Sequence, residues 1–225
     1  MNIRIRQIYY KPVQYGLCDE KFFPYENKKA SLFLENQVIA DLFNQKDYLD
    51  CDYYGIFSWK FRNKISYTSS YIFNRMEQLA NENFEVFSFF DANEQRNPNL
   101  NMWKQGNVWH PLFSTIGKLL FQELGLPDPL TIRTRLIFSN HWITTPKIYA
   151  RFCKEMLIPC MELMQNNQEI KELCEMDANY ISRDRLKEED CFPIFGKYYY
   201  TYHPFICERL FGTFCGLHDI KLKHI

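Results

Sequence analysis

Two pairs of polar side chains have the types and spacing that hold a divalent cation against phosphate oxygens. Asp50 and Asp52 lie two positions apart, just before an aromatic run, and Asp91 and Asn93 follow an almost wholly apolar segment. Carboxylate and amide oxygens are hard ligands that suit Mg²⁺ or Mn²⁺. Both pairs are also typical of turns, which Asp and Asn favour. A cation site and a turn therefore both remain open.

A tryptophan followed by two cations, and a carboxylate beside an arginine, are further candidates. Lys60 and Arg62 alternate after Trp59, so they share a face if the strand continues and would bind phosphate or carboxylate. The alternative is a solvated strand end. Glu208 lies beside Arg209 among apolar neighbours. It is a candidate base for a hydroxyl group, with its pKa set by burial. The alternative is a structural ion pair.

Two segments rich in aromatic and polar residues have the composition of a saccharide site. Trp103, Trp109 and His110 belong to the first, and Asn140, His141 and Trp142 to the second. Indole rings beside amides suit the face of a sugar, and an imidazole can act on a hydroxyl or bind phosphate. The alternatives are indoles that cover the core and a structural histidine.

Composition and missing motifs exclude several classes of protein. Lys+Arg and Asp+Glu balance at 27 each, so no basic excess predicts nucleic acid as a partner. The sequence contains no dinucleotide-binding glycine motif, no P-loop and no nucleophile elbow. It also contains no long apolar window and no signal peptide. We therefore expect a cytoplasmic protein without a transmembrane segment, at most peripheral to a membrane, whose 8 cysteines are reduced thiols.

Hydrophobic periodicity predicts alternating strands and helices, which is typical of an α/β fold. Strands are expected over 3–9, 53–59, 84–90 and 131–138, and helices over 31–44, 68–80, 111–125, 146–164 and 205–217. A polar loop is expected over 93–108. This order indicates a single domain, 1–225, with a mainly parallel central sheet flanked by helices and a largely helical part over 145–225.

Ligands of such sheets bind outside the carboxyl ends of the strands. This rule directs attention to the residues after Ile8, to Trp59 and its neighbours, to the segment 91–93 and to the segment 140–142. Gly55 lies inside an expected strand, where a glycine indicates close approach of another group.

Four segments together resemble small bacterial-type glycosyltransferases of the GT-A class, of the capsular or lipopolysaccharide sort, including galactan-type galactosyltransferases. They are Ile5-Arg-Gln-Ile-Tyr-Tyr10, Tyr53-Tyr-Gly-Ile-Phe-Ser-Trp-Lys-Phe61, Asn140-His-Trp-Ile-Thr-Thr-Pro-Lys147 and His203-Pro-Phe-Ile-Cys-Glu-Arg-Leu-Phe211. The resemblance lies in their order along the chain: an aromatic strand with a glycine, a strand that ends in a polar turn, an Asn-aromatic segment before a helix, and a late Glu-Arg-Leu helix.

The resemblance implies a Rossmann-like GT-A fold that moves a sugar from a nucleotide-sugar donor to a glycan or lipid-linked acceptor. The donor-binding residues would be Tyr9, Tyr10, Trp59, Lys60, Arg62 and Asn93, and the catalytic residues Glu208 and Asp91. The acceptor-binding residues would be Trp103, Trp109, His110, Asn140, His141, Trp142 and His203. Asp50, Asp52 and Asp91 would bind the Mn²⁺ or Mg²⁺ that such enzymes hold on an Asp-x-Asp motif.

The sequence departs from this class in three ways. Asp50 and Asp52 come before a nucleotide-binding half can be completed, and the Asp91–Asn93 pair has only one carboxylate. The chain is also short for the class, so the acceptor region would be either reduced or completed by a second copy or another subunit. The alternative function is a non-catalytic carbohydrate-binding or assembly protein that keeps the fold without a working donor site.

Overall fold

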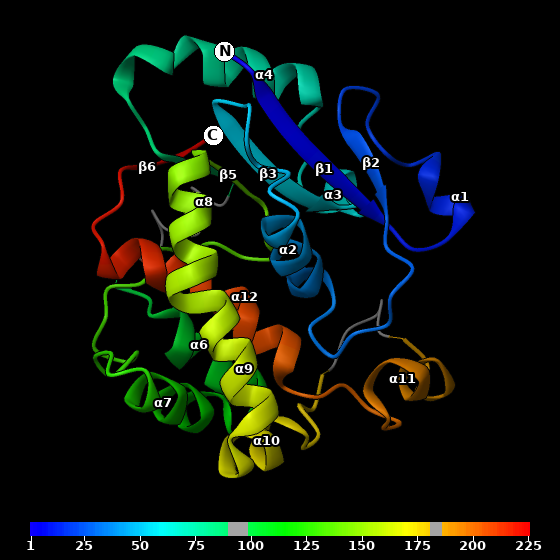
Figure 1. The fold of residues 1–225 in the computed structure, drawn as a ribbon, viewed down its shortest axis with the longest axis vertical. Helices are drawn as coiled ribbons and strands as arrows, with labels where there is room; N and C mark the ends of the chain where they lie inside the picture. The colour runs from blue at the N-terminus through cyan, green and yellow to red at the C-terminus, as the bar shows by residue number, and fades with distance from the viewer. Residues whose placement is uncertain (90–98, 181–185) are drawn as a thin grey trace.

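A mixed β-sheet of six strands forms the centre of the computed structural model, which describes residues 1–89, 99–180 and 186–225. The strands lie in the order β2-β1-β3-β5-β4-β6 (Figure 1). Their bounds are β1 Ile3–Tyr9, β2 Phe23–Glu26, β3 Tyr53–Ser58, β4 Val86–Ser88, β5 Trp142–Thr144 and β6 Leu222–His224. Strand β5 runs antiparallel to its neighbours β3 and β4, and the other pairs are parallel. The fold is therefore α/β with a mostly parallel sheet.

Helices flank the sheet, and a separate apolar core fills each face. The helices are α1 Pro12–Tyr15, α2 Glu35–Asn44, α3 Phe61–Lys64, α4 Ser69–Gln78, α6 Met102–Trp109, α7 Phe113–Glu123, α8 Pro146–Phe152, α9 Ile158–Asn166, α10 Gln168–Cys174, α11 Glu188–Phe195 and α12 His203–Leu217, with a short 3₁₀ turn at Ala80–Glu82. The larger core joins α2, α6, α7, α8, α9 and α12 to the sheet through Ile8, Tyr54 and Trp142. The smaller core packs Phe61 and Ile72 against the opposite face. None of the helices within the described ranges is long and apolar enough to cross a membrane.

Gly55 permits the contact between β3 and the reversed strand β5. A Cβ atom at this position would lie 3.1 Å from both the Cγ1 atom of Ile143 and the carbonyl oxygen of Trp142. In the sheet, Gly55 is the direct partner of Ile143. The close approach that the glycine predicted is therefore that of β5 itself.

The long helical segment after β5 begins at the predicted residue 146 and accommodates a proline in its interior. The Thr145 side chain accepts a hydrogen bond from the backbone of Ile148, and Pro146 occupies the first turn, where its missing N–H costs nothing. A π-helical turn, Cys153–Leu157, separates α8 from α9 just before Pro159. This turn changes the hydrogen-bond register where the proline supplies no donor.

Two sequence predictions of secondary structure are wrong. The segment 131–138, predicted as a strand, joins no sheet but runs beside α12, where the backbone N–H of Arg135 bonds the carbonyl of Gly212. The predicted loop 93–108 contains helix α6 from Met102 onward, whose first turn is capped by the Asn101 side chain. Strands β2, β5 and β6 were not predicted, because each has only three or four residues and depends on its neighbours.

Two glycines allow α12 to lie directly against the segment 131–138. A Cβ atom on Gly212 would overlap the carbonyl oxygen of Arg135, and one on Gly216 would overlap that of Arg133. Backbone atoms cannot move aside as a flexible side chain can. Helix α12 therefore has its position set by backbone contact, and with it the position of Glu208.

Gly212→Ala is expected to lower the free energy of unfolding by about 1–3 kcal/mol, because the methyl group must push α12 away from the neighbouring chain. Urea unfolding measures the loss. Gly16→Ala is the control: Gly16 has φ −66° and no atom within 4 Å of an added Cβ. Equal stability of the two variants would contradict the backbone contact.

Candidate functional site

A polar cleft of about 220 Å³ opens at the carboxyl end of β3. Its lining combines two cations, two carboxylates and several aromatic rings. The lining includes Trp59, Lys60, Lys64, Glu35, Glu208, Asn140, Tyr180 and Tyr200. Sequence reasoning selected Trp59, Lys60, Asn140 and Glu208, which come from distant parts of the chain. The structure brings these four residues together.

The direction of the strands explains why these residues meet. Ser58 ends β3, so Trp59 and Lys60 emerge at its carboxyl edge, just before α3. Because β5 runs the opposite way, the residues that precede it, Ser139 and Asn140, lie at this same edge. The Lys64 ammonium donates to the Ser139 hydroxyl at 3.0 Å. Two of the four places that the carboxyl-edge rule selects, Trp59 with its neighbours and Asn140, thus meet in one cleft.

Two carboxylates approach the cleft from two helices. Glu35 begins α2 and is half-buried, and Glu208 lies one turn into α12. Burial raises the pKa of Glu35, and the charge of Glu208 raises it further. Glu208 accepts a hydrogen bond of 3.2 Å from Arg209, whose guanidinium is buried and also lies over the rings of Phe113 and Phe138.

The backbone around the cleft is unusual at three positions. Leu34, Ser139 and Asn140 line the cleft with φ of 48°, 56° and 55°. With ψ −126°, Leu34 lies in a region of backbone conformation that residues other than glycine rarely occupy. Asn140 is held there by a hydrogen bond of 3.1 Å from its amide to the Asn36 side chain. Such strain persists only where the surroundings enforce it, and it concentrates at binding sites.

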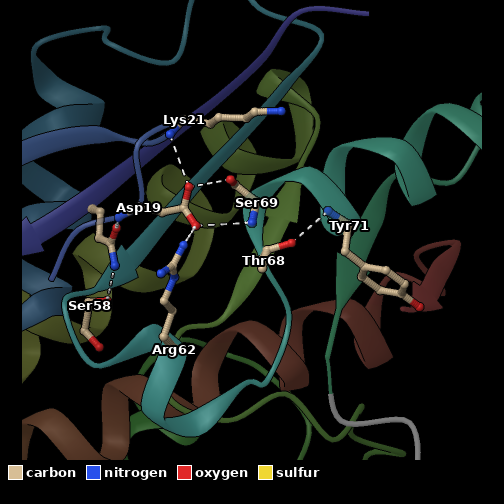
Figure 2. A network of polar contacts seen from close by, with 8 residues as sticks. Asp19, Lys21, Ser58, Arg62, Thr68, Ser69 and Tyr71 are labelled. Atoms are coloured by element: carbon tan, nitrogen blue, oxygen red, sulfur yellow. Dashed lines mark hydrogen bonds and ion pairs between the residues drawn. The ribbon is translucent and has the colours of Figure 1, made fainter.

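A buried carboxylate, Asp19, organises the neighbouring part of this edge (Figure 2). It accepts hydrogen bonds from Arg62 at 2.7 Å, from the backbone and hydroxyl of Ser69, and from the backbone of Lys21. Burial alone would raise the pKa of Asp19, but these hydrogen bonds lower it below its usual value. Gln7 completes the network by bonding the backbone of Asp19 and the carbonyl of Ser58. The network ties β1, β3, α3 and α4 together.

Three predicted donor residues lie outside the cleft. Arg62 pairs with Asp19 rather than lining the cleft beside Lys60. Tyr10 lines an adjacent pocket that shares Leu34 with the cleft. The ring of Tyr9 packs edge-on against Tyr15, with centroids 5.5 Å apart. Asp91 and Asn93 lie outside the described residues.

Most of the predicted acceptor residues lie in the core instead. Trp103, His141 and Trp142 are at most 1% exposed, so their rings offer no surface to a saccharide. Trp103 donates to Thr213 at 2.9 Å, and His141 packs edge-on against Phe57 and Phe61.

The other predicted acceptor residues behave differently from one another. His203 is buried and contacts Thr201 at 3.0 Å, and burial lowers its pKa to about 4. His110 bonds the carbonyl of Ala178 at 2.5 Å and stacks on Phe205, one of the cleft residues, from behind. Trp109 is 61% exposed at the end of α6. Of the predicted acceptor residues, only Asn140 lines the cleft.

The predicted metal ligands Asp50 and Asp52 lie at the opposite end of β3. Both precede the strand, whereas the cleft opens where it ends. Asp52 accepts a hydrogen bond of 2.7 Å from the backbone of Asn2, and Asp50 has φ 62°. Across the described ranges, no three His, Cys, Asp or Glu side chains gather as a metal site would require. Asp50 and Asp52 therefore fit a turn into β3.

Sequence reasoning missed Glu35, Lys64, Tyr180 and Tyr200. Glu35 begins a helix, where an acidic side chain is expected for its interaction with the helix dipole alone. Tyr200 belongs to the run Tyr198-Tyr-Tyr-Thr-Tyr202, whose density of aromatic rings was the one available signal. The rings of Tyr180 and Tyr200 lie 4.9 Å apart.

No protein-family model, curated protein or solved structure matches this chain. The assignment of a function therefore rests on the geometry of the cleft.

Glu35→Gln is expected to stabilise the protein at neutral pH and to leave its stability unchanged under acidic conditions. The pKa of Glu35 is raised in the folded state, so the native protein loses stability as pH rises from the carboxyl's unfolded value through the folded one. Urea unfolding at pH 4 and pH 8 measures the difference in stability between the variant and the unaltered protein. The two pH values lie below and well above the unfolded pKa of a glutamate, about 4.3. The exposed Glu162→Gln is the control; a gain there as large as in Glu35→Gln would contradict the assignment.

Proposed function

We propose that this protein is a glycosyltransferase that moves a sugar from a nucleotide-sugar donor to a saccharide or lipid-linked saccharide acceptor. The observation that carries the proposal is the cleft at the carboxyl edge of β3, where Lys60 and Lys64 share one lining with Glu35 and Glu208. The order of the four segments that resemble GT-A glycosyltransferases supports it. So does the mostly parallel sheet, which has the form expected for a nucleotide-binding half.

The cleft supplies the two charges that glycosyl transfer requires. The acceptor oxygen forms a bond to the anomeric carbon while the bond from that carbon to the donor diphosphate breaks. Lys60 and Lys64 would stabilise the negative charge on the departing diphosphate. Glu208 would accept the proton of the acceptor hydroxyl. Trp59, Tyr180 and Tyr200 offer rings for the base or the sugar.

One observation favours the alternative, a non-catalytic saccharide-binding or assembly protein. The Asp50-x-Asp52 pair lies at the wrong end of β3 to reach a diphosphate in the cleft. Binding of saccharides without binding of any nucleotide diphosphate would support this alternative over the transferase.

Lys60→Gln and Lys64→Gln should each weaken binding of the correct nucleotide diphosphate by about tenfold or more, because each removes a charge-assisted contact. Calorimetry with uridine, guanosine and cytidine diphosphates and their sugars, with and without Mn²⁺, tests this. Lys104→Gln is the control, since Lys104 is an exposed lysine on α6, outside the cleft lining. No heat of binding with any nucleotide would contradict the donor site.

Glu208→Gln should reduce sugar transfer by about 10²–10⁴-fold and leave donor affinity within a few-fold, because an amide cannot accept the proton. Product formation with a radiolabelled donor measures transfer, and calorimetry measures affinity. Glu162→Gln, on the exposed face of α9, serves as the control. A Glu208→Gln protein with full activity would remove Glu208 from the mechanism.

A further inference from the structure

Helix α1 and its flanks form a projection whose side chains are not buried but whose backbone is fixed by hydrogen bonds. We call residues 11–18 the α1 knob. None of the four residues of α1 is buried, and the side chains of Val13, Tyr15 and Leu17 are 78%, 57% and 52% exposed. Figure 1 shows α1 at the margin of the molecule, beyond the edge strand β2. An exposed apolar cluster of this kind indicates an interaction surface.

The knob is ordered by polar contacts at both ends. At its start, the side-chain oxygen of Gln14 accepts hydrogen bonds from the backbone of Tyr10 at 2.7 Å and of Lys11 at 3.0 Å. At its end, the chain enters the buried Asp19 network. The apolar side chains are thus presented on a fixed base rather than on a loose loop.

The charges around the knob are mainly positive. Over residues 11–29, the exposed charged side chains are Lys11, Lys21, Lys28, Lys29, Glu20 and Glu26. Four lysines therefore stand against two glutamates. Lys28 and Lys29 are paired with Glu26 and Asp41, whereas Lys11 and Lys21 take part in no ion pair within the described residues. Apolar tips flanked by lysines complement a surface of anionic lipid.

The edge of the sheet beside the knob is poorly suited to a second copy of the chain. Strand β2 is the outer strand, and Pro24 within it lacks the N–H that strand pairing needs. Phe23, 48% exposed, lies beneath the guanidinium of Arg6 at 5.6 Å. The charge pattern and this blocked edge favour a membrane over self-association.

We propose that the α1 knob docks the protein onto an anionic membrane surface, with Val13 and Leu17 entering the interface and Lys11 and Lys21 contacting lipid phosphates. Val13 lies on α1, and Leu17 lies in the turn directly after it, where its backbone N–H donates to the carbonyl of Gln14 at 3.0 Å. Helix α1 begins directly after the carboxyl end of β1, which is parallel to β3. Docking would therefore place the membrane on the edge of the sheet where the cleft opens. The proposal does not depend on transferase activity.

Cosedimentation of the full chain with extruded vesicles tests the proposal. Binding is expected to vesicles of phosphatidylcholine mixed with phosphatidylglycerol and to be much weaker with phosphatidylcholine alone. The double variant Val13→Ser, Leu17→Ser should lower the partition coefficient by about tenfold or more, because two apolar side chains no longer enter the interface. Lys11→Gln with Lys21→Gln should lower binding to the anionic vesicles and reduce its sensitivity to salt.

The chain offers a matched control in Val108→Ser with Leu49→Ser, because Val108 is 77% exposed and Leu49 43% exposed. This control should bind vesicles like the unaltered protein. The control and the Val13→Ser, Leu17→Ser variant should both keep the unfolding midpoint of the unaltered protein. Absence of binding to anionic vesicles, or an equal loss in the control, would overturn the proposal. So would sedimentation equilibrium that shows a dimer dissociated by the Val13 and Leu17 substitutions.

Discussion

The antiparallel course of β5 between β3 and β4 is the constraint on which the candidate site depends. A parallel strand in this place would begin at the amino edge of the sheet and carry Ser139 and Asn140 away from Lys60. Reversed, it delivers them to the carboxyl edge, where they join Trp59 in one cleft. Gly55 permits this pairing, because any side chain there would press on Ile143 and on the backbone of Trp142.

Two further sets of contacts hold the cleft walls in register with the sheet. The buried Asp19 connects Arg62 and Ser69 to the base of the α1 knob, and Gln7 joins this network to Ser58, so hydrogen bonds link the carboxyl edges of β1 and β3. On the other side, α12 lies in backbone contact with the segment 131–138 through Gly212 and Gly216. The first set of contacts is ionic and the second is steric. Moving either wall of the cleft would break these contacts and cost free energy. The strained backbone at Leu34 persists inside this frame.

Elements with strong local signals were predicted well. Strand β1 occupies the predicted residues 3–9, helix α4 lies within the predicted range 68–80, and α8 begins at the predicted residue 146. The predictions that failed share one cause: a local pattern does not determine which distant segment a residue packs against. The segment 131–138 alternates like a strand, but the backbone N–H of Arg135 bonds the carbonyl of Gly212 on α12 rather than a neighbouring strand. Trp103 and Trp142, candidates for a saccharide site because of their polar neighbours, pack with Phe113 and Phe211 in the core.

The sequence by itself determined the α/β class, the approximate positions of the long elements and four of the cleft residues: Trp59, Lys60, Asn140 and Glu208. These follow from periodicity, capping and the position of polar residues after apolar strands, all of which are local properties. The tertiary structure alone decided that Glu35 faces the cleft, that Arg62 is committed to Asp19, and that Asp50 and Asp52 lie at the other end of β3. Those outcomes depend on the order and direction of strands distant in the chain, and no local pattern encodes that order.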